Sequence, residues 1–412
     1  MSRNLRLASV FMALLCAAPA FISPAAQAKE LVLHTFRGGP GGGFPDAGLI
    51  RDTQGNLYGT TEWGGGSNII CDNGCGTVFK LAPDGRETVL HKFVAGNDGA
   101  FPVAPLVRDS AGNLYGTTQL GGTGSIGYGV IFRVSPKGKE RILYAFTGGD
   151  DGYLPQAGLI IDSAGNLYGT AQNGGAAGLG TVFKLTPRGK LVTLHSFIGG
   201  FGGSIPVAGL LRGGAAGNFY GTTELGGVDC DGTVNGCGIV YALSPEGHET
   251  VLYAFRGGKD GANPTGGVIM GAEGALYGTT HYGGLDCDGT GHGCGTIFKL
   301  TTEGHETVLW AFQGGGNDGA YPGRGNLVLA RNGTLYGTTP NGGLDCNGTG
   351  NGCGVLFRLS RRGGESILHI FGSGYDGAVP DGTPLNDAAG NFYGTTAEGG
   401  KLGEGTVYQL AQ

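Results

Sequence analysis

Short apolar runs bounded by turn residues fill almost the whole chain. In the first unit they cover residues 48–52, 57–61, 76–81 and 87–93, and they are rich in β-branched and aromatic residues. Runs of this length between clusters of Gly, Pro, Asn and Asp predict β-strands, so each unit is expected to hold four antiparallel strands. Because no stretch sustains an apolar period of 3.6 residues, we expect almost no helix.

This unit occurs seven times. The pentapeptide Leu-Tyr-Gly-Thr-Thr, or a close variant, recurs at intervals of 52–59 residues, starting at Leu57, Leu114, Leu167, Phe219, Leu276, Leu335 and Phe392. A proline leads into the first run of every unit, at positions 45, 102, 155, 206, 264, 322 and 380. A fixed period of this size indicates a repeat architecture. Seven four-stranded units predict an all-β fold, a seven-bladed β-propeller.

The two ends of the repeat complement each other. A spare fourth strand precedes the first unit at residues 31–36, and the last unit stops on its third strand at residues 405–410. The alternative is a linear β-solenoid, in which the first and last units do not meet and the spare strand could not fill the missing one. We expect the N-terminal strand to complete the C-terminal blade, because this pairing covers edges that would otherwise be open to aggregation. The long loops should share one face of the ring, where we expect a ligand, on that face or at the channel mouth.

The first residues have the pattern of a secretory signal peptide. Arg3 and Arg6 precede an apolar run at residues 7–22, and Ala26-Gln27-Ala28 offers a cleavage site. We expect residues 1–28 to be removed, leaving residues 29–412 as a single propeller domain. No other apolar stretch is long enough to cross a bilayer, so we expect a periplasmic or secreted protein without a membrane span.

The composition of the chain indicates which classes of binding partner are poor candidates. The chain has 26 Lys and Arg against 32 Asp and Glu, for a net charge of −6. Without a basic patch, nucleic acid and anionic lipid are poor candidates for partners. Its 91 glycines and 17 prolines would be typical of disorder in a chain without a period. Here the strict period favours a folded repeat instead.

The repeated motif also points to a family. Leu-Tyr-Gly-Thr-Thr, a Gly-Gly pair, Gly-Thr-Val-Phe-Lys-Leu and a Pro-x-Gly turn together resemble the GloVer tandem repeat of exported bacterial proteins, over essentially the whole mature chain. The section from Leu159 to Tyr168 is similar to NHL-type propeller blades, which agrees with the strand order. The resemblance implies an exported β-propeller. It brings no established reaction and no catalytic residues.

Eight of the nine cysteines form close pairs in the long loops of single units. In an exported protein this favours four local disulfides. Zinc is the alternative, although each loop offers only two thiols where four ligands are wanted. Asp229, Asp286 and Asp345 precede cysteines and suggest either a calcium loop or the capping of a tight turn, of which we favour the turn. The expected pairs are Cys71 with Cys75, Cys230 with Cys237, Cys287 with Cys294, and Cys346 with Cys353.

Two further positions repeat. The fourth strand carries His, Tyr or Trp two residues before a Phe, which we interpret as aromatic packing between neighbouring sheets and not as metal ligands. These residues are His34, His91, Tyr144, His195, Tyr253, Trp310 and His369. An Asp-Gly pair precedes the proline in five units, where we expect the aspartate to organise a turn.

The positions directly after the pentapeptide vary most between units and give the candidate binding residues. Glu62 and Trp63 follow the first pentapeptide, and His281 and Tyr282 follow the fifth. The two aromatic rings could stack on a glycan or a peptide, our two guesses for an extracellular ligand. The sequence holds no catalytic motif such as Gly-x-Ser-x-Gly or His-Glu-x-x-His. We therefore expect a binding or interaction scaffold without catalytic residues, cofactor or metal. A carbohydrate-active or lactonase-like hydrolase or lyase using the channel is the alternative.

Overall fold

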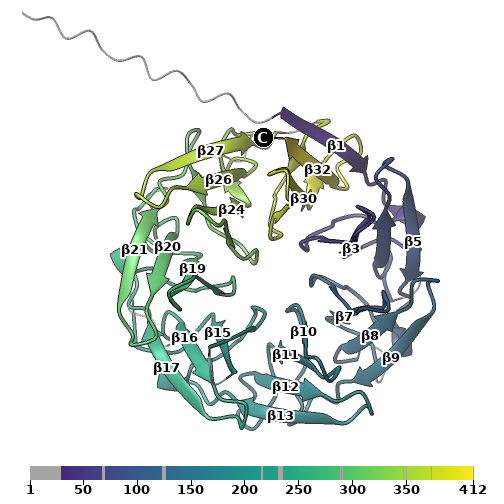
Figure 1. Ribbon diagram of the computed structural model, residues 1–412, viewed down its shortest axis with the longest axis horizontal. Coiled ribbons are helices and arrows are strands. Elements are labelled where there is room, and N and C mark those ends of the chain that lie inside the picture. The colour runs from purple at the N-terminus through teal and green to yellow at the C-terminus, as the bar shows by residue number, and fades with distance from the viewer. Residues whose placement is uncertain are drawn as a thin grey trace, which may run out of the picture.

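The computed structural model describes residues 29–66, 70–122, 127–214, 217–230, 235–287, 289, 291–346, 348, 350–372 and 374–411. Seven four-stranded antiparallel sheets stand around a central axis as the blades of a propeller, with the first strand of each blade innermost and the fourth outermost (Figure 1). The only helices in these ranges are four short 3-10 turns, η1 (Gly39–Gly41), η2 (Gly96–Asp98), η3 (Gly200–Gly202) and η4 (Gly258–Asp260). The predicted all-β seven-bladed propeller is confirmed.

The blades are numbered from the first complete sheet. Blade 1 contains β2 (Ile50–Arg51), β3 (Leu57–Thr61), β4 (Thr77–Leu81) and β5 (Glu87–Lys92). Blade 2 contains β6 (Val107–Arg108), β7 (Leu114–Thr118), β8 (Val130–Val134) and β9 (Glu140–Ala145). Blade 3 contains β10 (Ile160–Ile161), β11 (Leu167–Ala171), β12 (Thr181–Leu185) and β13 (Leu191–Ser196). Blade 4 contains β14 (Leu211–Gly213), β15 (Asn218–Thr223), β16 (Ile239–Leu243) and β17 (Glu249–Ala254).

The remaining blades follow the same order. Blade 5 contains β18 (Ile269–Met270), β19 (Leu276–Thr280), β20 (Thr296–Leu300) and β21 (Glu306–Ala311). Blade 6 contains β23 (Val328–Leu329), β24 (Leu335–Thr339), β26 (Val355–Leu359) and β27 (Glu365–Ile370). Blade 7 contains β29 (Leu385–Asn386), β30 (Phe392–Thr396), β32 (Thr406–Ala411) and β1 (Lys29–Thr35). Two small ribbons, β22 (Gly319–Ala320) with β25 (Asn341–Gly342) and β28 (Gly377–Ala378) with β31 (Glu398–Gly399), sit at the entries of blades 6 and 7.

Blade 7 is built from both ends of the chain. Strand β1 pairs antiparallel with β32, from Lys29 opposite Ala411 to Thr35 opposite Thr406. In Figure 1 the purple β1 lies beside the yellow strands of the same blade. The backbone groups of β32 that would face an open edge are therefore paired with β1. The predicted signal peptide, residues 1–28, lies outside the described residues and stays a prediction.

Every position of the repeated pentapeptide has a physical role, which blade 1 illustrates. Leu57 is buried, and the Tyr58 hydroxyl donates to Asp52 Oδ2 at 2.9 Å. Gly59 leaves room for the next strand, since a Cβ there would lie 2.7 Å from the Phe79 ring. The hydroxyl of Thr61 donates to the carbonyl of Trp63 at 2.8 Å, which starts the long loop. The motif repeats because each blade has the same interior to fill.

The first threonine of the pentapeptide joins neighbouring blades. Thr222 Oγ1 in blade 4 donates to the carbonyl of Gly266 in blade 5 at 2.9 Å, and Thr395 donates to the carbonyl of Ala47 across the 7/1 boundary at 2.8 Å. The same bond crosses four further boundaries, from Thr60, Thr117, Thr170 and Thr338. Because both partners are buried, each bond satisfies a carbonyl that water cannot reach.

An aromatic pair closes each boundary on the outer side. The Phe at the end of each fourth strand contacts an aromatic ring on the third strand of the following blade, with centroids 5.0–5.3 Å apart at all seven boundaries. Phe36 of β1 takes part by packing on Phe79 of blade 1. The core is therefore a ring of inter-blade clusters, and every blade depends on its neighbours.

Candidate functional site

A repeated backbone turn directs side chains into the channel mouth. The residue before each repeated proline has a positive φ between 53° and 61°: Phe44, Phe101, Leu154, Ile205, Asn263, Tyr321 and Val379. This conformation is costly for such side chains and persists only where the surroundings impose it. In blade 1, Phe44 N donates to the carbonyl of Glu404 and its own carbonyl accepts from Glu62 N, at 2.9 and 3.0 Å. The turn brings the residue after the proline to the inner rim.

The inner rim itself has room for few side chains. A Cβ added to Gly48 would lie 3.0 Å from the carbonyl oxygen of Thr383, and one added to Gly267 would lie 3.0 Å from that of Gly209. The first strands of neighbouring blades therefore approach through backbone atoms. Chemical variety at the mouth is restricted to the residues just after each proline and just after each pentapeptide.

Three of these variable residues form a charged cluster. Asp46 and Asp381 directly follow the prolines of blades 1 and 7, and Arg324 lies two residues after the proline of blade 6. The backbone N–H of Arg324 donates to Asp381 Oδ1 at 3.0 Å, and the Asp381 carboxylate fills the space beside Gly323. Glu62 faces the same cluster, because the charges of Asp46 and Arg324 both act on its carboxyl.

Crowding of acidic groups shifts their protonation. Burial and, to a smaller extent, the charge of Asp381 raise the pKa of Asp46 to about 7, although the charge of Arg324 acts against the rise. Burial likewise raises the pKa of Asp381, against the charge of Arg324 and the hydrogen bond from its backbone. Burial also raises the pKa of Glu62, and the charge of Asp46 adds to the effect. The mouth therefore holds three carboxyl groups with raised pKa values, of which Asp46 exchanges its proton near neutral pH.

Asp46, Arg324 and Asp381 line a cavity of about 170 Å³ at the centre of the ring. Six blades contribute to its wall, which includes Asp46, Gln156, Arg324, Asn326 and Asp381. The side chains of Gln156 and Gln172 are hydrogen-bonded to each other on the blade 3 side. A cavity with a few convergent polar groups and shifted pKa values has the features of a binding site.

Of the four residues expected from the sequence, only Glu62 turns to this cluster. Trp63 pairs through its backbone with Gly43 and packs its ring on Phe44, with centroids 4.2 Å apart. It borders a separate hollow of about 310 Å³ that also contains Asp72 and Glu404. Trp63 thus lies at the 7/1 boundary, where it remains a candidate for contact with a ligand.

His281 and Tyr282 lie in blade 5, away from Trp63. The His281 ring is hydrogen-bonded through Nδ1 to the carbonyl of Pro322 at 3.0 Å. Burial lowers its pKa, although this contact and the charge of Glu224 act in the opposite direction. Tyr282 is 37% exposed and contacts the rings of His281, His292 and Tyr321. Four expected binding residues therefore fall in three places, and the structure does not unite Trp63 with Tyr282.

Sequence reasoning missed Asp46, Asp381 and Arg324. For the two aspartates the signal is the position after the repeated proline, which holds Asp, Val, Gln, Val, Thr, Gly and Asp in the seven blades, and Arg324 lies one position further on. Where the residue type at an inner-rim position varies between otherwise similar blades, the fold does not require a particular side chain there. Detecting the cluster also requires knowing that blades 1, 6 and 7 are adjacent.

The opposite face carries a hollow of about 600 Å³ between blades 5 and 6. Its floor is apolar and its rim includes Glu273, Lys299, Arg331 and Arg361. Its Glu and two arginines are exposed, so water screens their charges more than those at the mouth. In blade 1 the same region is filled by bonds from Asn56 and Tyr58 to Asp52, whereas blades 5 and 6 have Gly271 and Ala330 in place of this aspartate.

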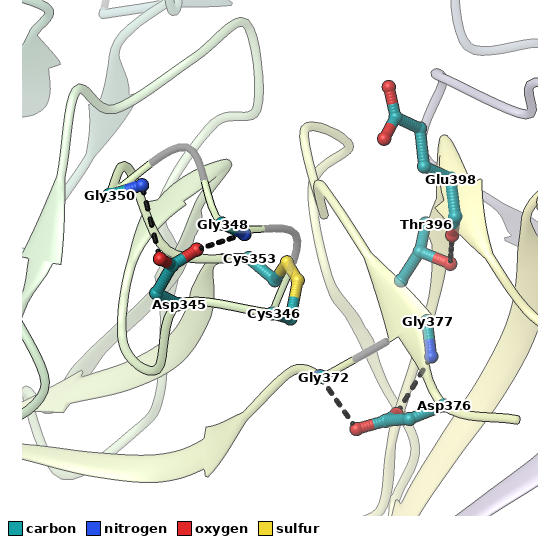
Figure 2. The surroundings of a disulfide bond; sticks show 10 residues. All are labelled: Asp345, Cys346, Gly348, Gly350, Cys353, Gly372, Asp376, Gly377, Thr396 and Glu398. Atoms are coloured by element: carbon teal, nitrogen blue, oxygen red, sulfur yellow. Dashed lines mark hydrogen bonds between the residues drawn. A yellow bond between two sulfur atoms is a disulfide. The ribbon is translucent and has the colours of Figure 1, made fainter. Parts of the chain in front are cut away.

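The long loops around the mouth are held by four disulfides, in the predicted pairs. The Cα atoms of Cys71 and Cys75 are 5.3 Å apart, and those of the other three pairs are 5.9 Å apart. Figure 2 shows Asp345 accepting hydrogen bonds from Gly348 N and Gly350 N of its own loop, at 2.9 and 3.2 Å. Asp286 accepts from Gly289 N in the same way. These aspartates cap their turns, as the sequence indicated.

Comparison with known proteins identifies the repeat. The family model described as the Gloeobacter/Verrucomicrobia repeat matches residues 21–162 and 124–351. No curated protein matches the chain. No helix among the described residues is long and apolar enough to cross a membrane.

Solved structures share the fold at low sequence identity. The extracellular domain provisionally identified as that of the hybrid two component system BT4673 from B. thetaiotaomicron is 10% identical with a TM-score of 0.56, and the match covers 92% of this chain but 39% of that one. A novel fungal alcohol oxidase of the AA5 family, in complex with copper, is 14% identical with a TM-score of 0.52 over 93% of this chain and 76% of the other. At these identities the likeness concerns the fold alone.

Proposed function

Because the chain belongs to the Gloeobacter/Verrucomicrobia repeat family, whose model spans residues 21–351, we propose that this propeller is an exported binding protein without catalytic activity. Its ligand docks at the channel mouth on the long-loop face. The observation that carries the proposal is the cluster of Asp46, Glu62, Asp381 and Arg324 at the mouth of a cavity. None of these residues belongs to the repeated motif, so the fold alone gives no reason for them.

The charge of the cluster supports a particular ligand chemistry. The cluster combines three carboxyl groups with one guanidinium, and a low-dielectric wall strengthens their field. This arrangement favours a positively charged group small enough for the cavity, such as the Lys or Arg side chain of a peptide. We assign the rest of an extended peptide to the aromatic rings of Trp63 in blade 1 and Tyr282 in blade 5.

Export is supported by the disulfides. Four cysteine pairs within single loops are typical of proteins that fold in an oxidising compartment. They fasten the loops that surround the mouth. A periplasmic or secreted location also agrees with the signal-peptide pattern of residues 1–28.

A hydrolase or lyase is the second candidate, favoured by one observation. Burial raises the pKa of Asp46 to about 7 and also raises that of Asp381, with each carboxyl influenced by the same Arg324. Pairs of carboxyl groups, one of them with a raised pKa, act as general acid and base in enzymes that cleave glycosidic bonds. In this case the ligand would be a glycan, and it would be converted.

The two candidates are separated by arrays of basic peptides and of glycans probed with the purified protein. We expect peptide binding, strengthened as pH rises through about 7 because Asp46 becomes ionised. Asp46→Asn and Asp381→Asn should each weaken it about tenfold or more, the cost of removing a charged hydrogen-bond partner. Trp63→Ala and Tyr282→Ala should weaken it less.

Glu273→Gln, on the opposite face and exposed, is the matched control and should change nothing. Equal binding by wild-type protein and both Asp variants would refute the site. Cleavage of an array glycan that stops in Asp46→Asn would establish the second candidate instead.

A further inference from the structure

The outer rim of the ring brings three positions together at each blade boundary. One is the His, Tyr or Trp of the fourth strand, the second is the Asp that precedes the next proline, and the third is the Glu that begins the next fourth strand. In blades 4 and 5, for example, the Tyr253 hydroxyl donates to Asp260, and the charges of Asp260 and Glu306 interact. The rim thus buries a carboxylate-rich cluster at most boundaries.

At two boundaries of the described chain all three positions offer a metal-binding side chain. His91, Asp98 and Glu140 meet between blades 1 and 2, and His369, Asp376 and Glu30 meet between blades 6 and 7, with each set of ligand atoms within 4.8 Å of one another. Each of the other boundaries lacks at least one of the three metal-binding residues, His, Asp or Glu. His195 and Glu249, for example, lie 3.4 Å apart between blades 3 and 4, where η3 has no acidic residue.

The set between blades 6 and 7 has the geometry of a metal site. His369 Nε2 lies 3.5 Å from both Glu30 Oε2 and Asp376 Oδ2. His369 is only 8% exposed, and neither of its ring nitrogens has a hydrogen-bond partner; Glu30 Oε1 also has none. Two ligands bound at 2.0–2.1 Å to a tetrahedral ion are about 3.4 Å apart. These separations therefore suit ligands that share an ion better than direct hydrogen bonds.

The supporting contacts orient the carboxylate. Figure 2 shows Asp376 held by two backbone N–H groups, Gly372 N at 2.9 Å from Oδ2 and Gly377 N at 2.8 Å from Oδ1. Ligating carboxylates in metal sites are commonly fixed by such outer hydrogen bonds. The His369 ring is fixed by edge contact with Phe371, at a centroid distance of 4.7 Å.

We propose that His369 Nε2, Asp376 and Glu30 bind a divalent transition-metal ion of the zinc type at the boundary between blades 6 and 7. One imidazole and two carboxylates are ligands that zinc accepts. Glu30 lies on β1, so the ion ties the N-terminal strand to blade 6 in addition to its pairing with β32. Metal binding therefore stabilises the closure of the ring.

The contacts within the two sets decide which of them is the tight metal site. The set between blades 1 and 2 differs, because His91 Nε2 is already hydrogen-bonded to Asp98 Oδ1 at 3.1 Å. We therefore assign the tight metal site to the set that contains His369.

Residues at the equivalent position of other blades suggest substitutions that test the metal site. Tyr occupies the His369 position in blades 2 and 4, where its hydroxyl donates to the equivalent aspartate, so His369→Tyr should fold normally while losing a ligand. Asp376→Asn keeps the side-chain shape. His195→Tyr, at the two-ligand boundary, is the matched control. Tyr253→His completes a His, Asp and Glu set between blades 4 and 5 and should gain a site.

The measurement is zinc titration of the chelator-treated full chain by calorimetry, with melting temperature as a second readout. We expect wild-type protein and His195→Tyr to bind one tight equivalent and to melt several degrees higher with zinc. His369→Tyr and Asp376→Asn should lose that equivalent and the thermal shift, and Tyr253→His should bind one more. Unchanged stoichiometry in His369→Tyr, loss in His91→Tyr instead, or no zinc binding by the wild type would each overturn the proposal.

Discussion

The inner and outer rims of this ring join the same blades by different means. At the inner rim, neighbouring blades meet through backbone and a repeated threonine, as in the bond from Thr222 to the Gly266 carbonyl. At the outer rim they meet through long side chains, such as His34 beside Glu87 at 3.5 Å. The threonine contacts of the inner rim are nearly identical at six boundaries, whereas the polar contacts of the outer rim change from boundary to boundary.

This difference explains where individual chemistry can arise. A backbone contact allows no substitution, so the inner rim varies only after the prolines, and there the Asp46, Arg324 and Asp381 cluster forms. A side-chain contact tolerates His or Tyr at the same place, because each of these rings packs on the following Phe of its own strand. The sequence-based prediction was packing between neighbouring sheets, and it missed the carboxyl groups that face the polar atoms of these residues.

The largest effect is expected from removing β1, the outermost strand of blade 7. Deleting residues 29–37 removes β1, exposes β32 and deletes Phe36 from the outer boundary. We expect the melting temperature to fall by about 10 °C or more, because a row of backbone hydrogen bonds and a buried aromatic pair are lost. Differential scanning calorimetry and size-exclusion chromatography measure stability and oligomers.

Leu31→Ser is the control for this deletion, since Leu31 is 56% exposed on the same strand. It should melt within a few degrees of the wild type. A deletion variant that remains monomeric and equally stable would show that the ring does not need β1.

A smaller effect tests the inner rim. Thr222→Val keeps the side-chain volume but leaves the buried carbonyl of Gly266 without its donor, at a cost of about 1–3 kcal/mol in the free energy of unfolding. Thr250→Val, on the exposed side of β17 in the same blade, should cost far less. Urea unfolding followed by fluorescence measures both. Equal costs for the two variants would mean that the repeated threonine does not join the blades.

The smallest effect concerns protonation at the outer rim. Burial raises the pKa of Glu87 to about 7, with Lys92 acting against the rise, and raises those of Glu140, Glu249 and Glu306 to about 7 as well. The folded state therefore holds these protons more tightly than the unfolded state, so stability is lost as pH rises from about 4.5 to 7. Burial lowers the pKa of His34 and His195, and this opposes the trend below pH 6.5.

Melting temperatures at pH 5, 7 and 9 test this expectation. The wild type should lose several degrees between pH 5 and 9, with the outer carboxylates outnumbering the histidines. Glu87→Gln removes one ionisation and should reduce the loss. Thr250→Val again serves as the control, with the pH dependence of the wild type. A Glu87→Gln profile parallel to the wild type would contradict the assignment of the loss to these glutamates.

Much of the fold followed from local patterns. The strands were predictable because Gly, Pro and Asn mark their ends, and the disulfides because each pair lies within one loop. For the candidate site, the sequence indicated only the face of the ring on which it lies, and not the residues that form it. Trp63 and Tyr282 were chosen by residue type, yet the first packs on Phe44 and the second joins an aromatic group with Tyr321.

The sequence by itself determined the blade count, the strand order and the repeated interior, since each depends on residues close together in the chain. Only the tertiary structure decided which variable residues meet. Asp46 reaches Asp381 across the 7/1 boundary, and Glu30 reaches His369 across the 6/7 boundary, because the closed ring places opposite ends of the chain in one blade and its neighbours. Local propensity carries no information about contacts between such distant segments. The chemistry at the channel mouth and at the outer rim therefore arises from ring closure, which buries each set of charged groups at its own boundary.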